Sequence, residues 1–375
     1  MRRPLYRGCR SGYACRVKGM SPALVVAGLL MASTPVAPGG ERPIVIAHRG
    51  ASGERPEHTL EAYRLGIEQG ADFVEPDLVA TKDGALVCRH ENEISGTTDV
   101  ASRPEFAARR ATKTIDGVPA TGWFTEDFTL AELKTLRARE RLPELRGTAF
   151  DGRFEVPTFE ELLALVASAN ARPDRRGRPI GVYPETKHPS YFAGLDLALE
   201  PPLVELLRRH GLDRADAPVF VQSFEVSNLK RLEQLTRVPL VQLIEPLGSP
   251  WDFTLGRSAQ SYADLVKPEG LREIASYARG IGVHKNLVLP RDGSDRLLSS
   301  TSLVRDAHAA GLLVHVFTLR AENRFQPAEL RRGSEPAALG DMAAEATLFL
   351  KAGVNGYFTD HPAIGVKARD AFLRN

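Results

Sequence analysis

Cysteine is scarce in this chain of 375 residues, which holds three. Cys9 and Cys15 lie before residue 20, so Cys88 is the one cysteine of the remaining sequence. A single cysteine cannot form an internal disulfide, and we therefore expect the hydrophobic core to stabilise the fold. Cys88 lies on an expected strand, where a small buried hydrophobic side chain is favoured over a nucleophile.

An excess of charge of either sign is also lacking. The chain has 49 Lys and Arg residues against 47 Asp and Glu residues, a formal net charge of +2. No basic stripe with interleaved aromatic residues occurs, which argues against a nucleic-acid partner. No apolar run reaches the roughly 20 residues of a membrane-spanning helix. We expect no stable membrane span.

The first 38 residues have the organisation of a secretory signal peptide. Six basic residues and no acidic residue precede Met20, an apolar run covers residues 23–32, and a tail of small residues follows. The cleavage position is left open, and Met20 is an alternative start that gives a more compact leader. The pattern predicts export to the periplasm or the medium. The alternative is an unstructured N-terminus with a chance apolar run.

From residue 43 to 375, short apolar runs alternate with helical patterns. Such alternation implies a parallel sheet. The strand-like runs number about eight and no dinucleotide-binding glycine fingerprint occurs, so the sequence favours an α/β fold of the TIM (β/α)8 barrel type over an open doubly wound sheet. Strands are expected at 43–48, 72–79, 85–90, 180–186, 218–222, 239–244, 281–289, 312–318 and 356–359. Helices are expected at 60–67, 159–166, 203–209, 226–235, 271–278, 303–310, 343–351 and 363–372.

Residues 91–157 interrupt this alternation. Their Gly, Pro and Thr groups indicate loops and small turns around one helix at 130–139. We interpret the segment as a loop-rich insertion after a barrel strand, where insertions commonly shape the substrate cleft.

Two of the expected strands carry carboxylate side chains. Glu75 and Asp77 are two residues apart, so their side chains share one strand face. Two neighbouring carboxylates repel each other unless a cation lies between them, and Ca²⁺ or Mg²⁺ prefers oxygen ligands. The apolar residues on both sides of the pair favour burial over a solvent-facing strand edge.

A later strand repeats this spacing with Glu185 and Lys187. Glu185 is the candidate third metal ligand, and Lys187 is a candidate contact for an anionic substrate oxygen. A buried salt bridge between strands is the alternative. Gln222 ends a further strand, where it can bind substrate or serve as a core amide.

Two histidines complete the candidate site. His48 and His90 each end an apolar run and bracket the carboxylate pair. The unperturbed pKa of histidine, near 6.5, allows one imidazole to act protonated and the other neutral. Arg49 offers a planar, permanently charged group suited to phosphate. A structural role at a strand end is the alternative for each histidine alone.

This ordered set of motifs resembles the glycerophosphodiester phosphodiesterase family, in its larger exported bacterial type. The resemblance runs from about residue 43 to 365. It is carried by His48-Arg49-Gly50, Pro56-Glu57-His58-Thr59, Glu75-x-Asp77, Lys82-Asp83-Gly84, His90, Glu185-x-Lys187, Gln222-Ser223-Phe224 and the run from Gly353 to Pro362. Two departures are Glu91, where the family frequently has Asp, and Pro76, which removes a backbone donor from a predicted strand.

The resemblance implies hydrolysis of glycerophosphodiesters to an alcohol and sn-glycerol 3-phosphate. By the same resemblance, His48 and His90 are the general acid and base, and Glu75, Asp77 and Glu185 bind a divalent metal. Arg49 and Lys187 would contact the phosphate. The exported type implies Ca²⁺ first, with Mg²⁺ as the alternative.

Several alternatives stay open at this stage. The nucleophile is either water or the 2-hydroxyl of the substrate's glycerol, and the sequence does not divide the acid and base roles between the histidines. A phospholipase-type enzyme acting on a lipid headgroup is a second interpretation. An exported binding protein that has lost activity is a third.

Overall fold

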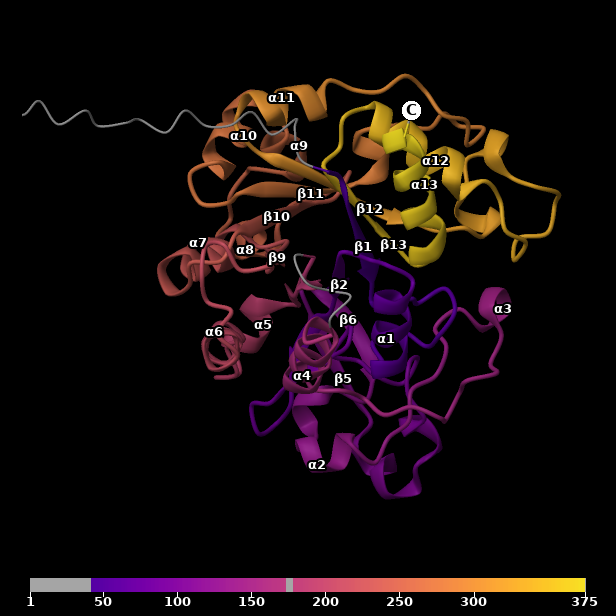
Figure 1. Ribbon diagram of the computed structural model, residues 1–375. Coiled ribbons are helices and arrows are strands. Elements are labelled where there is room, and N and C mark those ends of the chain that lie inside the picture. The colour runs from indigo at the N-terminus through magenta and orange to yellow at the C-terminus, as the bar shows by residue number, and fades with distance from the viewer. Residues whose placement is uncertain (1–41, 173–177, 375) are drawn as a thin grey trace, which may run out of the picture. The chain divides into compact units, whose positions relative to one another are not determined.

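A closed ring of parallel strands is the centre of the molecule, as the computed structural model shows for residues 42–172 and 178–374 (Figure 1). The predicted signal peptide and the alternative start at Met20 lie outside these residues. The strands of the sheet are β1 (Ile44–His48), β2 (Phe73–Glu75), β3 (Asp77–Ala80), β7 (Gly181–Val182), β8 (Glu185–Thr186), β9 (Val221–Ser223), β10 (Leu240–Ile244), β11 (Gly280–His284), β12 (Leu313–Leu319) and β13 (Gly356–Thr359).

Two of the ring's eight strands, counted over the described residues, are each broken at a proline. β2 and β3 are halves of one strand separated by Pro76, and β7 and β8 flank Pro184. The register continues across both breaks, since Phe73 pairs with Gly181 and Asp77 with Glu185. Proline has no N–H to donate to the ladder, which explains the interruption.

The ring closes because β1 pairs with both β13 and β2, while β8 pairs with both β3 and β9. The predicted α/β barrel is therefore confirmed. One expected barrel strand is wrong, however. The run at 85–90 forms β4 (Leu86–Cys88), which pairs antiparallel with β3 and lies outside the ring. The hairpin of β3 and β4 leads the chain back to the end of the barrel where β1 and β2 finish. There the N–H of Arg89 donates to the carbonyl of Asp77 at 3.0 Å.

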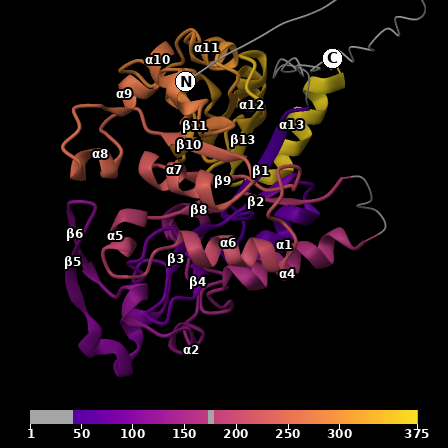
Figure 2. The same ribbon diagram turned by 90° about the vertical axis from the view of Figure 1, so that its left-hand side faces the viewer.

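Helices cover the outside of the barrel (Figures 1 and 2). α1, α4, α7 and α13 each contact strands of the ring. Their bounds and those of the other helices outside residues 91–157 are α1 (Leu60–Glu68), α4 (Phe159–Asn170), α5 (Pro189–Ala193), α6 (Glu200–Arg209), α7 (Val226–Leu235), α8 (Trp251–Leu255), α9 (Tyr262–Leu265), α10 (Pro268–Ile274), α11 (Leu303–Ala309), α12 (Met342–Lys351) and α13 (Pro362–Arg374). Short 3-10 helices lie at Lys285–Leu287, Asn323–Phe325 and Ala328–Leu330.

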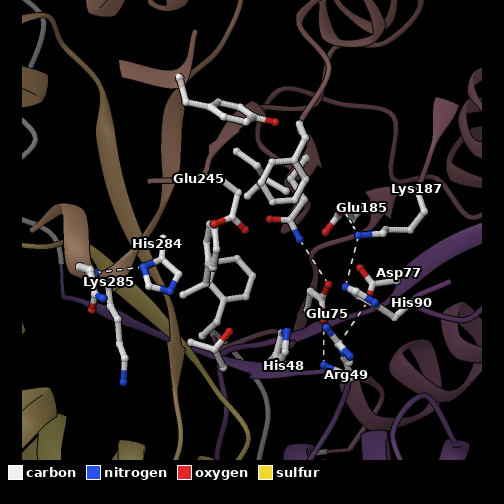
Figure 3. A pocket seen from close by; sticks show the side chains of 18 of the residues that line it. His48, Arg49, Glu75, Asp77, His90, Glu185, Lys187, Glu245, His284 and Lys285 are labelled. Atoms are coloured by element: carbon white, nitrogen blue, oxygen red, sulfur yellow. Dashed lines mark hydrogen bonds and ion pairs between the residues drawn. The ribbon is translucent and has the colours of Figure 1, made fainter. Parts of the chain in front are cut away.

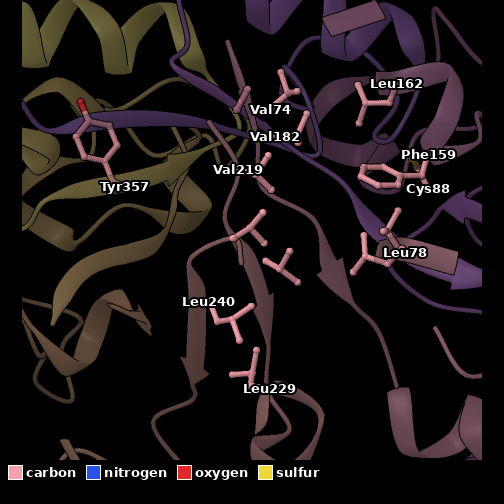
Figure 4. Packing of buried hydrophobic residues seen from close by; sticks show 14 of the residues in the cluster. Val74, Leu78, Cys88, Phe159, Leu162, Val182, Val219, Leu229, Leu240 and Tyr357 are labelled. Carbon is pink, nitrogen blue, oxygen red and sulfur yellow. The ribbon is translucent and has the colours of Figure 1, made fainter. Parts of the chain in front are cut away.

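Hydrophobic side chains pack on both faces of the barrel wall, because neighbouring residues of a strand point to opposite faces. On β1, Val45 and Ala47 join the large outer core, whereas Ile46 joins an inner cluster with Tyr183, Val241 and Phe358. Figure 4 shows part of the outer core, where Leu78 and Cys88 lie near Phe159 of α4. Cys88 is a buried free thiol, as expected for a packing residue.

The insertion predicted at 91–157 contains more regular structure than expected. It holds 3-10 helices at Val100–Ser102, Pro104–Arg109 and Thr125–Asp127, a hairpin of β5 (Ala111–Ile115) and β6 (Val118–Gly122), and the helices α2 (Leu130–Leu133) and α3 (Pro143–Arg146). The tip of the hairpin reaches the barrel mouth, where Asp116 Oδ2 lies 2.6 Å from Nδ1 of His188.

The single helix expected at 130–139 is wrong. α2 ends at Leu133, and the following residues pair with a distant segment instead. The N–H of Asp99 donates to the carbonyl of Arg137 at 2.9 Å, and the N–H of Arg137 donates to the side chain of Asp99 at 2.8 Å. These long-range bonds outweigh the local helix propensity, which is a weak preference of a few tenths of a kcal/mol per residue.

Phe159→Ala tests the packing of α4 against the barrel. The side chain of Phe159 is fully buried, and its removal leaves a cavity that we expect to cost about 3–5 kcal/mol of unfolding free energy. Urea unfolding followed by circular dichroism measures this loss. Leu247→Ala is the control, because Leu247 is 85% exposed and its truncation is expected to change stability by less than about 0.5 kcal/mol. Equal stability of the two variants would contradict the packing.

Candidate active site

A cavity of about 700 Å³ opens at the mouth of the barrel (Figure 3). It lies at the end of the ring where β1 and β2 finish, as active sites of α/β barrels do. All eight residues that the sequence analysis selected line it: His48, Arg49, Glu75, Asp77, His90, Glu185, Lys187 and Gln222.

Three carboxylates from neighbouring strands meet in this cavity. Glu75, Asp77 and Glu185 are buried, and one oxygen from each lies within 4.8 Å of the others. Asp77 and Glu185 are register partners across β3 and β8, which explains their approach. The predicted juxtaposition across two strands is thus present in the molecule.

Burial and the charges of neighbouring groups shift the pKa values of these three carboxylates. Burial, together with the charges of Asp77 and Glu185, raises the pKa of Glu75 well above its usual range. Burial also raises the pKa of Glu185 to about 8. Burial alone would raise the pKa of Asp77 as well, but His90, Lys187 and His58 hold it well below its usual range. Three buried carboxylates this close cannot all be ionised without added positive charge.

The donor atoms fit a hard divalent cation. All three ligating groups are carboxylates, the ligand type preferred by Ca²⁺ and Mg²⁺. Oδ1 of Asp77 is buried without a hydrogen-bond partner among the described residues, as is Oε1 of Gln222. The remaining contacts orient the cluster, since the N–H of Arg49 donates to Glu75 at 2.8 Å and Nε2 of Gln222 donates to Glu75 at 3.3 Å.

Two positively charged side chains, those of Arg49 and Lys187, lie next to the carboxylates. Arg49 has a φ of 58° and is followed by Gly50 at 84°, so the chain turns sharply after β1. Its guanidinium pairs with Asp77 at 3.3 Å and with Glu57 at 2.9 Å. Nζ of Lys187 lies 2.8 Å from Oε1 of Glu185. Lys187 therefore pairs with a carboxylate of its own strand, whereas the alternative expected a salt bridge between strands, and it also lines the cavity.

Nδ1 of each catalytic candidate, His48 and His90, lies within hydrogen-bond distance of a carboxylate. Nδ1 of His48 lies 2.6 Å from Oδ1 of Asp360, and Nδ1 of His90 contacts the carboxylate of Glu91. Nε2 of His90 lies 3.3 Å from Nζ of Lys187. A carboxylate on Nδ1 fixes the tautomer in which Nε2 carries the lone pair. Both imidazoles are thereby set to accept a proton at Nε2.

Burial keeps both imidazoles neutral. It lowers the pKa of His48 to about 4, with the charge of Arg49 adding to the effect and Asp360 opposing it. Burial, Arg49 and Lys187 lower the pKa of His90 to about 3. The unperturbed pKa of histidine predicts one protonated and one neutral imidazole at physiological pH, whereas the lowered pKa values favour the neutral form of both.

Four residues around the site were not assigned a role from the sequence. Asp360 directly follows β13 and lies level with His48, the last residue of β1, because Ala47 pairs with Thr359; a signal at a strand end was therefore present. Glu57 and Arg141 form an ion pair at 2.7 Å across 84 residues, which no sequence spacing indicates. His58 is buried, with Nε2 2.9 Å from Oδ2 of Asp77.

Comparison with known proteins identifies the family. The model of the glycerophosphoryl diester phosphodiesterase family matches residues 48–364. The chain belongs to this family. A glycerophosphodiester phosphodiesterase of Arabidopsis thaliana is 36% identical over 85% of this chain and 84% of its own length. One of Haemophilus influenzae is 29% identical over 94% of this chain and 98% of its own length. The chain is accordingly an enzyme that hydrolyses phosphoric diesters.

Solved structures agree on the fold of this phosphodiesterase. A putative family member from Silicibacter pomeroyi superimposes with a TM-score of 0.60 at 21% identity, covering 89% of this chain and 96% of that one. An Oleispira antarctica phosphodiesterase, solved in complex with the product sn-glycerol-3-phosphate, gives a TM-score of 0.53 at 21% identity over 88% of this chain and 97% of that one. Within residues 42–172 and 178–374, no helix has the length and apolar character to cross a membrane.

Asp77→Asn tests the cation site independently of turnover. Asp77→Asn removes the charge of a candidate ligand whose Oδ1 has no hydrogen-bond partner among the residues that the structure describes. We therefore expect Ca²⁺ affinity to fall at least about tenfold, or about 1.4 kcal/mol. Isothermal titration calorimetry with CaCl₂ measures the affinity. Asp213→Asn is the control, because Asp213 pairs with Arg208 away from the cavity. Unchanged Ca²⁺ binding in Asp77→Asn would contradict the assignment.

Proposed function

We propose that this enzyme hydrolyses glycerophosphodiesters to an alcohol and sn-glycerol 3-phosphate, with His48 and His90 as general acid and base and with a divalent cation held by Glu75, Asp77 and Glu185. The observation that carries the proposal is the meeting, in one cavity, of three carboxylates and two carboxylate-bound imidazoles. The sn-glycerol-3-phosphate bound by the Oleispira phosphodiesterase, which has the same fold, supports the choice of substrate.

In this proposal, the substrate phosphate faces the cations of the cavity. Arg49 and Lys187 retain N–H groups beyond those that pair with Glu57, Asp77 and Glu185, and a guanidinium fork suits two phosphoryl oxygens. Preorganised positive groups stabilise the charge that develops on those oxygens in the transition state. A bound divalent cation would supply further stabilisation of the same charge.

The proton transfers are assigned to the two imidazoles. One accepts the proton of the nucleophile at Nε2, because Nδ1 is held by a carboxylate. The other donates a proton to the departing alkoxide. The bound phosphate opposes the lowering of the imidazole pKa values by burial, since a nearby negative charge favours the protonated form. The nucleophile is water, or it is the glycerol 2-hydroxyl, whose attack forms a cyclic phosphate that water then opens to sn-glycerol 3-phosphate.

Turnover of glycerophosphocholine with Ca²⁺ tests the proposed function. We expect release of sn-glycerol 3-phosphate by the wild type, and a fall of roughly 10²- to 10⁴-fold in kcat for His48→Ala and for His90→Ala with the fold retained. Chelation should abolish turnover, and Ca²⁺ should restore it better than Mg²⁺. His210→Ala, near Glu160 on the outer surface, is the matched control.

Two results would overturn the proposal. One is near-normal turnover in either histidine variant, and the other is activity that persists in excess chelator after metal analysis finds no retained ion. Cleavage of a phospholipid headgroup without release of free sn-glycerol 3-phosphate would favour the phospholipase-type alternative.

We also propose that the chain is exported, on the basis of the basic, apolar and small-residue segments of its first 38 residues. Expression of the full-length chain in a Gram-negative host followed by cell fractionation tests this. The expected result is a shortened protein in the periplasm or medium, whose N-terminal sequence begins between the apolar run and residue 43. A full-length chain confined to the cytoplasmic fraction would contradict it.

A further inference from the structure

Two arginines of the insertion reach the carboxylates that hold the two histidines. Arg141 lies two residues before α3, and Arg146, five positions later, is the last residue of that helix. Arg146 contacts Asp360, the partner of His48, and Arg141 contacts Glu91, the partner of His90. One short segment outside the barrel ring is therefore bonded to both imidazole–carboxylate pairs.

Several hydrogen bonds restrain the side chain of Arg146. Nη2 donates to Oδ2 of Asp360 at 2.6 Å, while Oδ1 of the same carboxylate lies 2.6 Å from Nδ1 of His48. Nε donates to Glu322 at 2.6 Å and Nη1 donates to the carbonyl of Ser52 at 2.8 Å. The Arg146 side chain is 7% exposed. Nε of Arg320 also donates to Oδ2 of Asp360, at 2.8 Å. The two arginines together restrain the Asp360 carboxylate and, through it, the direction of the imidazole.

Arg141 makes the corresponding contacts beside His90. Nη1 donates to Oε1 of Glu91 at 3.0 Å, and Nη2 donates to Oε2 at 2.5 Å. Nε and Nη2 each donate to Glu57 at 2.7 Å. Glu57 in turn accepts from Arg49 at 2.9 Å. Arg141 therefore connects the carboxylate of His90 to the arginine proposed to bind phosphate.

The segment between the two arginines is held to the rest of the insertion. The N–H of Leu142 donates to Glu140 at 2.9 Å, and the N–H of Glu140 donates to Asp151 at 2.7 Å. Pro143 begins α3, where its fixed φ suits the first helical position. The two guanidinium groups are consequently fixed relative to each other.

We propose that Arg141 and Arg146 are positioning residues for catalysis, through which the insertion aims Nε2 of both histidines at the reacting phosphate. This inference rests on the proposed function of His48 and His90. Its physical basis is the sensitivity of proton transfer to geometry, because a displacement of about 1 Å at a reacting group can cost roughly 10²-fold in rate. An ion-pair network that only stabilises the fold is the competing outcome.

Steady-state kinetics of Arg146→Ala, Asp360→Asn and the double variant, with glycerophosphocholine and Ca²⁺, test the proposal for His48. We expect each single variant to lower kcat by roughly 10- to 100-fold, as outer-shell partners of catalytic groups do, with KM little changed. The double variant should lose little more than Asp360→Asn alone, because both act through one imidazole. Arg146→Lys, or a low concentration of guanidinium with Arg146→Ala, should restore part of kcat.

For His90 we expect a different combination of changes in kcat and KM. Arg141→Ala should lower kcat because it frees Glu91, and it should also raise KM, because Glu57 then pairs with Arg49 alone and competes with the substrate phosphate for it. Arg109→Ala is the control for both, since Arg109 lies in the same insertion but pairs with Glu132. Its kcat should match the wild type.

The outcomes separate this inference from the proposed function. A wild type without turnover of any glycerophosphodiester overturns both. Turnover by the wild type together with an unchanged kcat in Arg146→Ala and Arg141→Ala overturns the positioning role alone. A loss of kcat that is accompanied by a lower melting temperature and is restored neither by Arg146→Lys nor by guanidinium also overturns it. If Arg146→Ala does not fold, Asp360→Asn and Arg146→Lys decide the question by the same criteria.

Discussion

Repulsion among three buried carboxylates is the constraint on which the rest of the site depends. Glu75, Asp77 and Glu185 lie within 4.8 Å of one another, in an environment that raises the pKa of Glu75 and of Glu185. Such a cluster needs positive charge close by. Arg49 and Lys187 supply part of it by direct contact. A divalent cation is suited to supply the remainder, and it would bring the phosphate to the same point.

Two prolines help to place this cluster. Pro76 and Pro184 interrupt neighbouring strands at equivalent positions, while the pairing of Asp77 with Glu185 continues beyond both breaks. The hydrogen bond from the N–H of Glu185 to the carbonyl of Pro76, at 2.9 Å, keeps the two strands together at the interruption. The barrel therefore supplies the three carboxylates. The hairpin of β3 and β4 leads to His90, and the insertion supplies Arg141 and Arg146.

Much of the barrel could be predicted from the sequence, because it depends on local periodicity. A continuous apolar run predicted β1, and the helix expected from residue 159 begins there, after the Thr158–Glu161 capping box. The antiparallel pairing of β4 and the early end of α2 depend on long-range hydrogen bonds, such as that between Asp99 and Arg137, which no local pattern encodes. The site shows the same division. Residues at strand ends were found, whereas the contact of Glu57 with Arg141 across 84 residues was not.

The central claim is that cation, phosphate and both imidazoles meet at one point of the barrel mouth. A crystal structure of the protein with Ca²⁺ and sn-glycerol 3-phosphate tests it most directly. The account predicts an ion bound by Glu75, Asp77 and Glu185, with the phosphate between that ion and Arg49 and within reach of Nε2 of His48 and of His90. An ion or a phosphate bound elsewhere in the molecule, with the three carboxylates unliganded, would contradict it.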